Sequence, residues 1–135
     1  MMQQRNPIRL LFAMLISFLF FASSCRLPVG APDAGVVTNL RFGPSAFDSF
    51  KSNTEIRYSL KTPASVSVVI VRRDSLQNEI PIATLISKTR ETSGTHAHTW
   101  LGNTDRGMFA PAGTYFGIVL ADNERFEASV CVFHY

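Results

Sequence analysis

The strongest constraint on the fold of this chain is an alternation of apolar and polar residues that recurs in short segments from residue 36 onward. Between Thr54 and Lys61, for example, Ile56, Tyr58 and Leu60 alternate with polar residues. Side chains two residues apart lie on the same face of a strand, so this pattern predicts strands with one buried face. The seven segments of this kind are 36–42, 54–61, 64–72, 80–88, 95–100, 114–121 and 125–133.

Turn-forming residues separate these segments, and no stretch after residue 25 shows the 3.6-residue apolar period of an amphipathic helix. We therefore expect residues 36–135 to form an all-β domain, an Ig-like or fibronectin III-like antiparallel β-sandwich of about seven strands. Pro81 suits an edge strand or the beginning of a strand. The expected core residues are Ile56, Tyr58, Leu60, Val66, Val68, Ile70, Trp100, Tyr115, Val119, Phe126 and Val130.

The N-terminus predicts export from the cytoplasm. Arg5 and Arg9 precede a run over residues 10–22 that is apolar apart from Ser17. About a dozen apolar residues is short for a hydrocarbon core about 30 Å thick, which favours a secretory signal peptide over a membrane-spanning helix. We assign the signal peptide to residues 1–24.

Small residues, Ala22-Ser23-Ser24, lead directly to Cys25. This resembles the lipobox of bacterial lipoproteins, although Ala22 stands where a branched apolar residue is usual. The resemblance implies lipidation of Cys25, cleavage before it, and a protein anchored in the cell envelope. Residues 25–35 would then comprise the lipidated cysteine and a flexible tether whose last ten residues reach at most about 33 Å. The alternative is an ordinary signal peptide or an uncleaved anchor, in which Cys25 is incidental.

Charge and cysteine content narrow the function further. Of 13 Lys and Arg, Arg5 and Arg9 leave with the signal peptide, so 11 remain against 10 Asp and Glu, a net charge of +1. The basic residues are scattered, which argues against nucleic acid as a partner.

Cys131 would have no partner if Cys25 is acylated, and we expect a buried, inert thiol. Without acylation, a Cys25–Cys131 disulfide becomes an option. Arg26 differs from the aspartate that retains some lipoproteins in the inner membrane, which favours the outer membrane if the cell has one.

An ordered set of short motifs resembles one family. The set comprises Phe42-Gly43-Pro44, Ile56-Arg57-Tyr58-Ser59-Leu60, Pro63-Ala64-Ser65-Val66-Ser67-Val68, Gly94-x-His96-x-x-x-Trp100-x-Gly102, Thr104-Asp105-x-Gly107 and Pro111-Ala112-Gly113-Thr114-Tyr115. It is similar to the Ig-like domain first described in the flagellar hook-capping protein, FlgD. The resemblance covers about residues 36–125 and implies an Ig-like fold with a general, non-flagellar role.

The central motif of that set has a physical explanation. Trp100 supplies a large ring to anchor the core, and Tyr115 is placed to bond back to a turn, as in the tyrosine corner of other sandwiches. Gly102, Gly107 and Gly113 suit a tight loop that requires positive φ. The chain departs from the family at His98, where a core residue is usual, and at Leu101, where an acidic residue is usual.

Histidines are the only candidates for metal chemistry. His96 and His98 share a strand face about 7 Å apart, and His134 is a conceivable third ligand. No carboxylates cluster near them in sequence, so we expect structural histidines, no metal and no cofactor. The chain also lacks G-x-S-x-G, H-E-x-x-H and phosphate-loop motifs, and we expect no enzymatic activity.

Binding is the remaining class of function. Loops on a rigid sandwich carry most binding residues, and the candidate partner-contact residues are Asn103, Asp105, Arg106, Met108 and Phe109. We expect Met108 and Phe109 to tuck under as a cap on the sandwich, with an exposed docking pair as the alternative. The resulting hypothesis is a non-catalytic, lipid-anchored Ig-like module that binds or scaffolds another cell-envelope protein, through an edge strand or an end loop.

A proteinase inhibitor is the alternative function. The intracellular proteinase inhibitors of Bacillus type are similar to this chain in one stretch. The matching residues are Trp100, Asp105, Gly107, Pro111, Gly113, Thr114 and Tyr115. An inhibitor would present residues 103–110 to a protease cleft.

Overall fold

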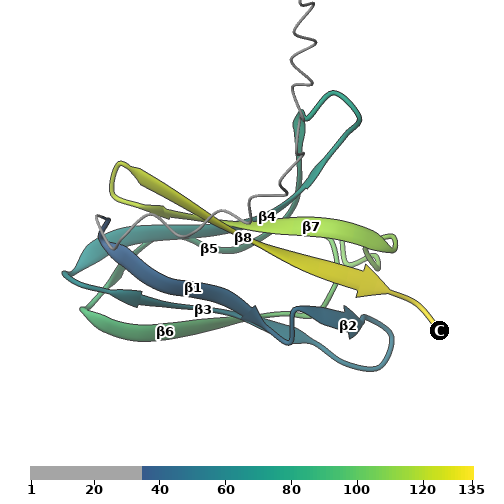
Figure 1. The fold of residues 1–135 in the computed structure, drawn as a ribbon, viewed down its shortest axis with the longest axis horizontal. Helices are drawn as coiled ribbons and strands as arrows, with labels where there is room; N and C mark the ends of the chain where they lie inside the picture. The colour runs from purple at the N-terminus through teal and green to yellow at the C-terminus, as the bar shows by residue number, and fades with distance from the viewer. Residues whose placement is uncertain (1–34) are drawn as a thin grey trace, which may run out of the picture.

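The computed structural model describes residues 35–135 as two β-sheets packed face to face (Figure 1). One sheet has the order β1-β3-β6 and the other the order β2-β8-β7-β4-β5. The strands are β1 (Val37–Gly43), β2 (Ala46–Asp48), β3 (Thr54–Leu60), β4 (Ala64–Arg73), β5 (Glu79–Glu91), β6 (Gly94–Trp100), β7 (Gly113–Ala121) and β8 (Glu124–Phe133). The expected all-β sandwich is confirmed, and the part of the chain that the structure describes contains no helix.

The described chain has one strand more than the seven expected. β2 is three residues long and pairs in parallel with the end of β8, from Ala46 beside Cys131 to Asp48 beside Phe133. The sandwich is therefore not wholly antiparallel. Three residues cannot display an alternating pattern, and their partner lies at the other end of the chain, so the sequence alone gave no signal for β2.

The alternation does identify the core. Ten of the eleven expected core residues are buried, and Phe126 is partly buried. Trp100 closes one end of the core, where its ring packs edge-on against Phe47 at 5.6 Å and tilted against Tyr115 at 5.3 Å. At the centre, Gly117 lies under Ile56 and Phe42, so the two sheets approach closely there.

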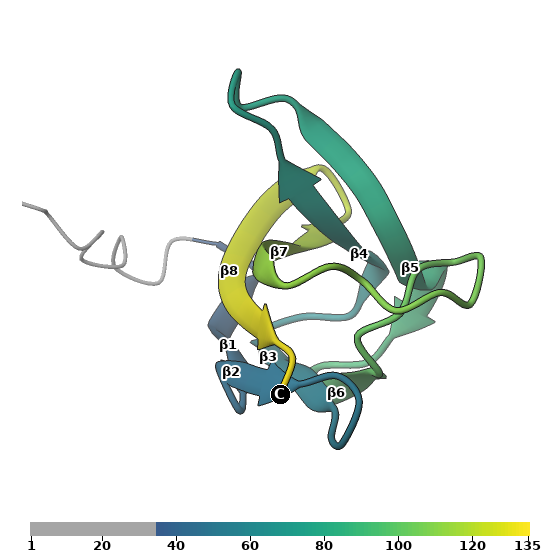
Figure 2. The same ribbon diagram turned by 90° about the vertical axis from the view of Figure 1, so that its right-hand side faces the viewer.

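β5 lies at the edge of its sheet, one of the two placements that Pro81 suits, but it is longer than expected. Its pairing with β4 contains register shifts, and Lys88 adopts a positive φ of 45°. The β4–β5 hairpin extends beyond the sandwich as an arm (Figures 1 and 2). At the base of the arm, Arg73 bridges Glu79 at 3.0 Å and Glu127 at 2.6 Å. This ion-pair group ties the arm to β8.

The two ends of the sandwich differ in what they carry. The chain enters β1 beside the β7–β8 turn, where the Val36 N–H donates to the Glu124 carboxylate at 3.0 Å. β1 then runs to the opposite end, where Gly43 pairs with Glu55. That opposite end carries the link between β2 and β3, the link between β6 and β7, and the C-terminus (Figure 1). No helix capable of crossing a membrane is found within residues 35–135.

Candidate functional site

The predicted contact loop, residues 103–109, is a compact turn. The Thr104 N–H donates to the Met108 carbonyl at 2.7 Å, and the Ala110 N–H donates to the Gly102 carbonyl at 2.8 Å. Gly102 and Gly107 adopt φ values of 74° and 78°, as the loop geometry requires. The backbone therefore turns back on itself, whereas a protease cleft takes an extended segment.

Asp105 fixes this loop to the edge of β5. Its backbone N–H donates to the Ile82 carbonyl at 3.0 Å, and its carboxylate accepts from the Thr84 N–H at 2.9 Å. A groove of about 330 Å³ lies between the loop and β5, lined by Pro81, Ile82, Thr104, Asp105, Arg106 and Met108. Asp105 thus shields backbone groups of an edge strand that would otherwise face solvent.

Met108 and Phe109 are exposed, and the expectation that they tuck under the sandwich is wrong. Their exposed fractions are 59% and 55%. The reason is that Trp100 already fills this end of the core and donates its indole N–H to the Asn103 carbonyl at 2.9 Å. No room remains beneath the loop, so Phe109 packs sideways on Phe50 instead.

Phe50, Phe109 and the partly exposed His134 form an aromatic cluster. Together with Met108, the exposed neighbour of Phe109 in the loop, we call this cluster the end patch. The Phe50 ring lies edge-on to Phe109 at 4.7 Å and tilted against His134 at 4.3 Å. Ser49 holds His134 in place through a 3.0 Å hydrogen bond to Nε2. Phe50 could not be recognised as a surface residue from the sequence, because an isolated phenylalanine between polar residues shows no periodic pattern.

The tyrosine corner predicted from the sequence is present in the structure. Tyr115 is buried and donates its hydroxyl to the Pro111 carbonyl at 2.5 Å, forming the expected corner. Burial also raises the pKa of Tyr115 above its ordinary value. Gly113, the first residue of β7, adopts a positive φ of 150°.

His96 and His98 lie on the inner face of β6 beside a buried carboxylate. The Glu91 carboxylate accepts from the Tyr58 hydroxyl at 2.6 Å and lies 2.9 Å from His98 Nε2 and 3.7 Å from His96 Nδ1. His96 Nε2 lies 2.7 Å from the Thr92 carbonyl, so this nitrogen carries the proton. Within residues 35–135 no three His, Cys, Asp or Glu side chains are arranged to hold a metal. The sequence did not reveal Glu91 because its partners come from other strands.

Cys131 is exposed, and the expectation of a buried thiol is wrong. It lies on the outward face of β8, in the alternation that buries Val130 and Val132. The predicted signal peptide, Cys25 and the predicted tether up to residue 34 lie outside the described residues.

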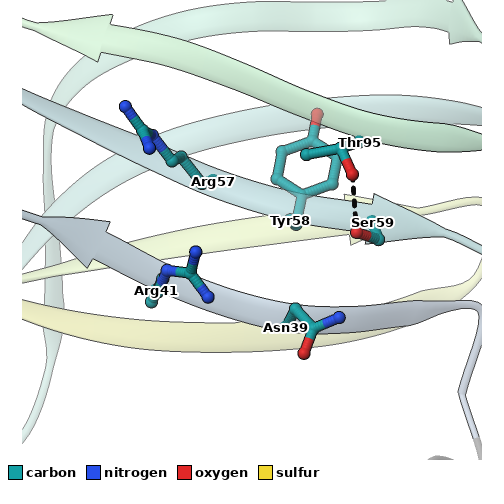
Figure 3. A pocket seen from close by; sticks show the side chains of 6 residues that line it. All are labelled: Asn39, Arg41, Arg57, Tyr58, Ser59 and Thr95. Atoms are coloured by element: carbon teal, nitrogen blue, oxygen red, sulfur yellow. Dashed lines mark hydrogen bonds between the residues drawn. The ribbon is translucent and has the colours of Figure 1, made fainter.

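A second hollow lies on the outer face of the three-stranded sheet and has a volume of about 290 Å³. Its lining residues are Asn39, Arg41, Arg57, Tyr58, Ser59 and Thr95. Figure 3 shows Arg41 and Asn39 extending from β1, Arg57 from β3, and the 3.1 Å hydrogen bond between the Ser59 and Thr95 hydroxyls. Nothing in the sequence pattern singled out this hollow, because its residues come from three strands.

No protein-family model matches the chain, and a search of curated proteins also finds no match.

Proposed function

We propose that this protein is a non-catalytic module, anchored at its N-terminus by lipid on Cys25, that binds another protein of the cell envelope through the end patch. The observation that carries the proposal is the exposure of Phe50, Met108 and Phe109 together, at 53%, 59% and 55%. Exposed aromatic and methionine side chains are enriched where proteins contact one another.

The position of the patch supports the same function. The chain enters the sandwich at the end of Val36 and Glu124, and the end patch lies at the opposite end. A tether attached at the first end would hold the patch away from the membrane. The patch would then face other envelope components while the acyl chains hold the protein at the bilayer.

The groove beside the patch extends the contact area. Met108 belongs both to the end patch and to the lining of the groove between loop 103–109 and β5. A partner side chain seated there would meet Pro81 and Ile82 on one side and Arg106 on the other. A hydrophobic centre with a polar border is the usual anatomy of a protein interface.

The test is photo-cross-linking of the full chain in its native membranes, with a cross-linker at Leu101, an exposed residue close in sequence to loop 103–109. We expect a discrete adduct with one envelope protein, and we expect Phe109→Asp to abolish it. Leu76→Asp is the matched control, because Leu76 is 79% exposed but lies at the tip of the arm. If the yield of the adduct is as high in Phe109→Asp as in Leu76→Asp, the proposed contact is overturned.

Two further measurements complete the test. The intact mass of the detergent-extracted protein should equal residues 25–135 plus acyl chains, and a mass without lipid would overturn the anchor. Inhibition of common serine proteases by the purified protein would instead favour the alternative function, a proteinase inhibitor.

A further inference from the structure

The hollow on the outer face of the three-stranded sheet has an unusual charge arrangement. Arg41 on β1 and Arg57 on β3 are Cα partners in the antiparallel pairing, so two positive side chains lie directly opposite each other on an exposed face. Like charges in this position destabilise a sheet. A structural role does not account for such a pair.

The negative charge near the pair is insufficient for both guanidinium groups. Glu55 accepts from Arg57 Nε at 2.9 Å and from Nη2 at 2.5 Å through the same oxygen. Arg41 forms no ion pair within residues 35–135. One carboxylate therefore faces two cations, and the hollow keeps a net positive charge.

The backbone of β1 is adapted at the same place. The β1–β3 register shifts between Thr38 and Arg41, and Asn39 adopts a positive φ of 54°. A bulge of this kind turns side chains away from the regular pleat and is frequent next to active sites and at sheet edges, where β1 lies. Here it places the Asn39 amide at the wall of the hollow, beside Arg41 (Figure 3).

The lining is rich in hydrogen-bond donors. Two guanidinium groups, the Asn39 amide and the hydroxyls of Ser59 and Thr95 surround the space. Guanidinium groups match the oxygens of phosphates and carboxylates, and a tetrahedral phosphate offers more acceptors to so many donors than a carboxylate does. We propose that this hollow binds a phosphate-bearing anion held between Arg41 and Arg57. The site is separate from the end patch, so the inference stands independently of the proposed protein contact.

The experiment is an NMR titration of the mature protein, purified from membranes in a maltoside detergent and labelled with ¹⁵N. Two probes are used: sodium phosphate, and dihexanoyl phosphatidylglycerol below its critical micelle concentration, each against sodium chloride at equal ionic strength. We expect saturable shifts of the Asn39 side-chain amide and of the Arg41 and Arg57 Nε–H signals. Similar affinities indicate a soluble phosphate ligand, whereas tighter binding of the lipid indicates a membrane headgroup.

Two variants decide whether the arginine pair is responsible. Arg41→Gln should weaken phosphate binding about tenfold or more, because hydrogen bonds to charged groups are lost. Arg90→Gln, an exposed arginine on β5, is the matched control and should leave binding unchanged. The proposal is overturned if the chemical shifts never saturate. It is also overturned if both variants change the binding equally.

Thermal unfolding gives a second readout that a purely structural arginine would not show. Removing one of two opposed like charges should leave the Tm of Arg41→Gln equal to or above that of the native protein without phosphate. Phosphate should raise the Tm of the native protein and not that of the variant. A lower Tm for the phosphate-free variant would assign Arg41 to stability and overturn the proposal.

Discussion

The hydroxyl of Tyr58 donates to the carboxylate of Glu91 at 2.6 Å, across the gap between the two sheets. Tyr58 lies at the centre of β3 and is 1% exposed, while Glu91 ends β5 and is 8% exposed. His98 on β6 supports the same carboxylate at 2.9 Å. A buried carboxylate is costly unless it is hydrogen-bonded, so this contact fixes the end of β5 to the opposite sheet.

Tyr58→Phe is expected to destabilise the protein by about 1–2 kcal/mol, because it removes one hydrogen bond to a buried carboxylate. The ring and its packing are retained, so the loss isolates the hydroxyl. Urea unfolding of the variant and the native protein at neutral pH measures the difference. Ser59→Ala, on the exposed face of the same strand, is the control, and an equal loss for both variants would contradict the prediction.

The stability should also fall in alkali. Burial, followed by the hydrogen bond to Glu91 and its charge, holds the pKa of Tyr58 well above the ordinary tyrosine value of about 10. Tyr58 therefore keeps its proton in the folded chain where the unfolded chain loses it, so unfolding releases a proton above about pH 10. The stabilisation is complete below that pH and declines as the pH rises. Urea midpoints from pH 8 to pH 11 should fall less steeply for Tyr58→Phe than for the native protein.

At Gly117 the two sheets approach so closely that an added side chain would press against residues of the opposite sheet. A Cβ atom there would lie 2.5 Å from Ile56 Cδ1 and 2.6 Å from Phe42 Cζ. Gly117→Ala is expected to cost about 1–3 kcal/mol through overpacking. Gly43→Ala is the control, since no heavy atom lies within 4 Å of its Cβ position. A second substitution, Phe42→Leu, should recover part of the loss, and additive effects of the two changes would exclude the contact as its cause.

Cys131 should react with a maleimide reagent in the folded protein, because its thiol is exposed on β8. Mass spectrometry after labelling without denaturant should show one added group if Cys25 is acylated. No labelling until the protein is unfolded would contradict the exposure.

The core residues can be predicted from the sequence, whereas the exposed features of the surface cannot. The two-residue period assigns Ile56, Tyr58 and Leu60 to the core because one register of a strand buries every second side chain. The exposure of Phe109 depends instead on whether Trp100 leaves space beneath the loop, which is a question of packing. The Arg41–Arg57 pairing depends on the register of two strands, and no local pattern encodes it.

A substitution of Asp105 can show whether this residue holds the loop against β5 or contacts the partner protein. Its carboxylate accepts from the Thr84 N–H at 2.9 Å, so Asp105→Ala should expose that part of the β5 edge. We expect a loss of about 1 kcal/mol, as for a typical hydrogen bond, and faster amide exchange at Thr84. If Asp105 only shields β5, the adduct at the end patch persists in Asp105→Ala and is lost in Phe109→Asp. Loss of the adduct with unchanged exchange at Thr84 would place Asp105 in the partner interface instead.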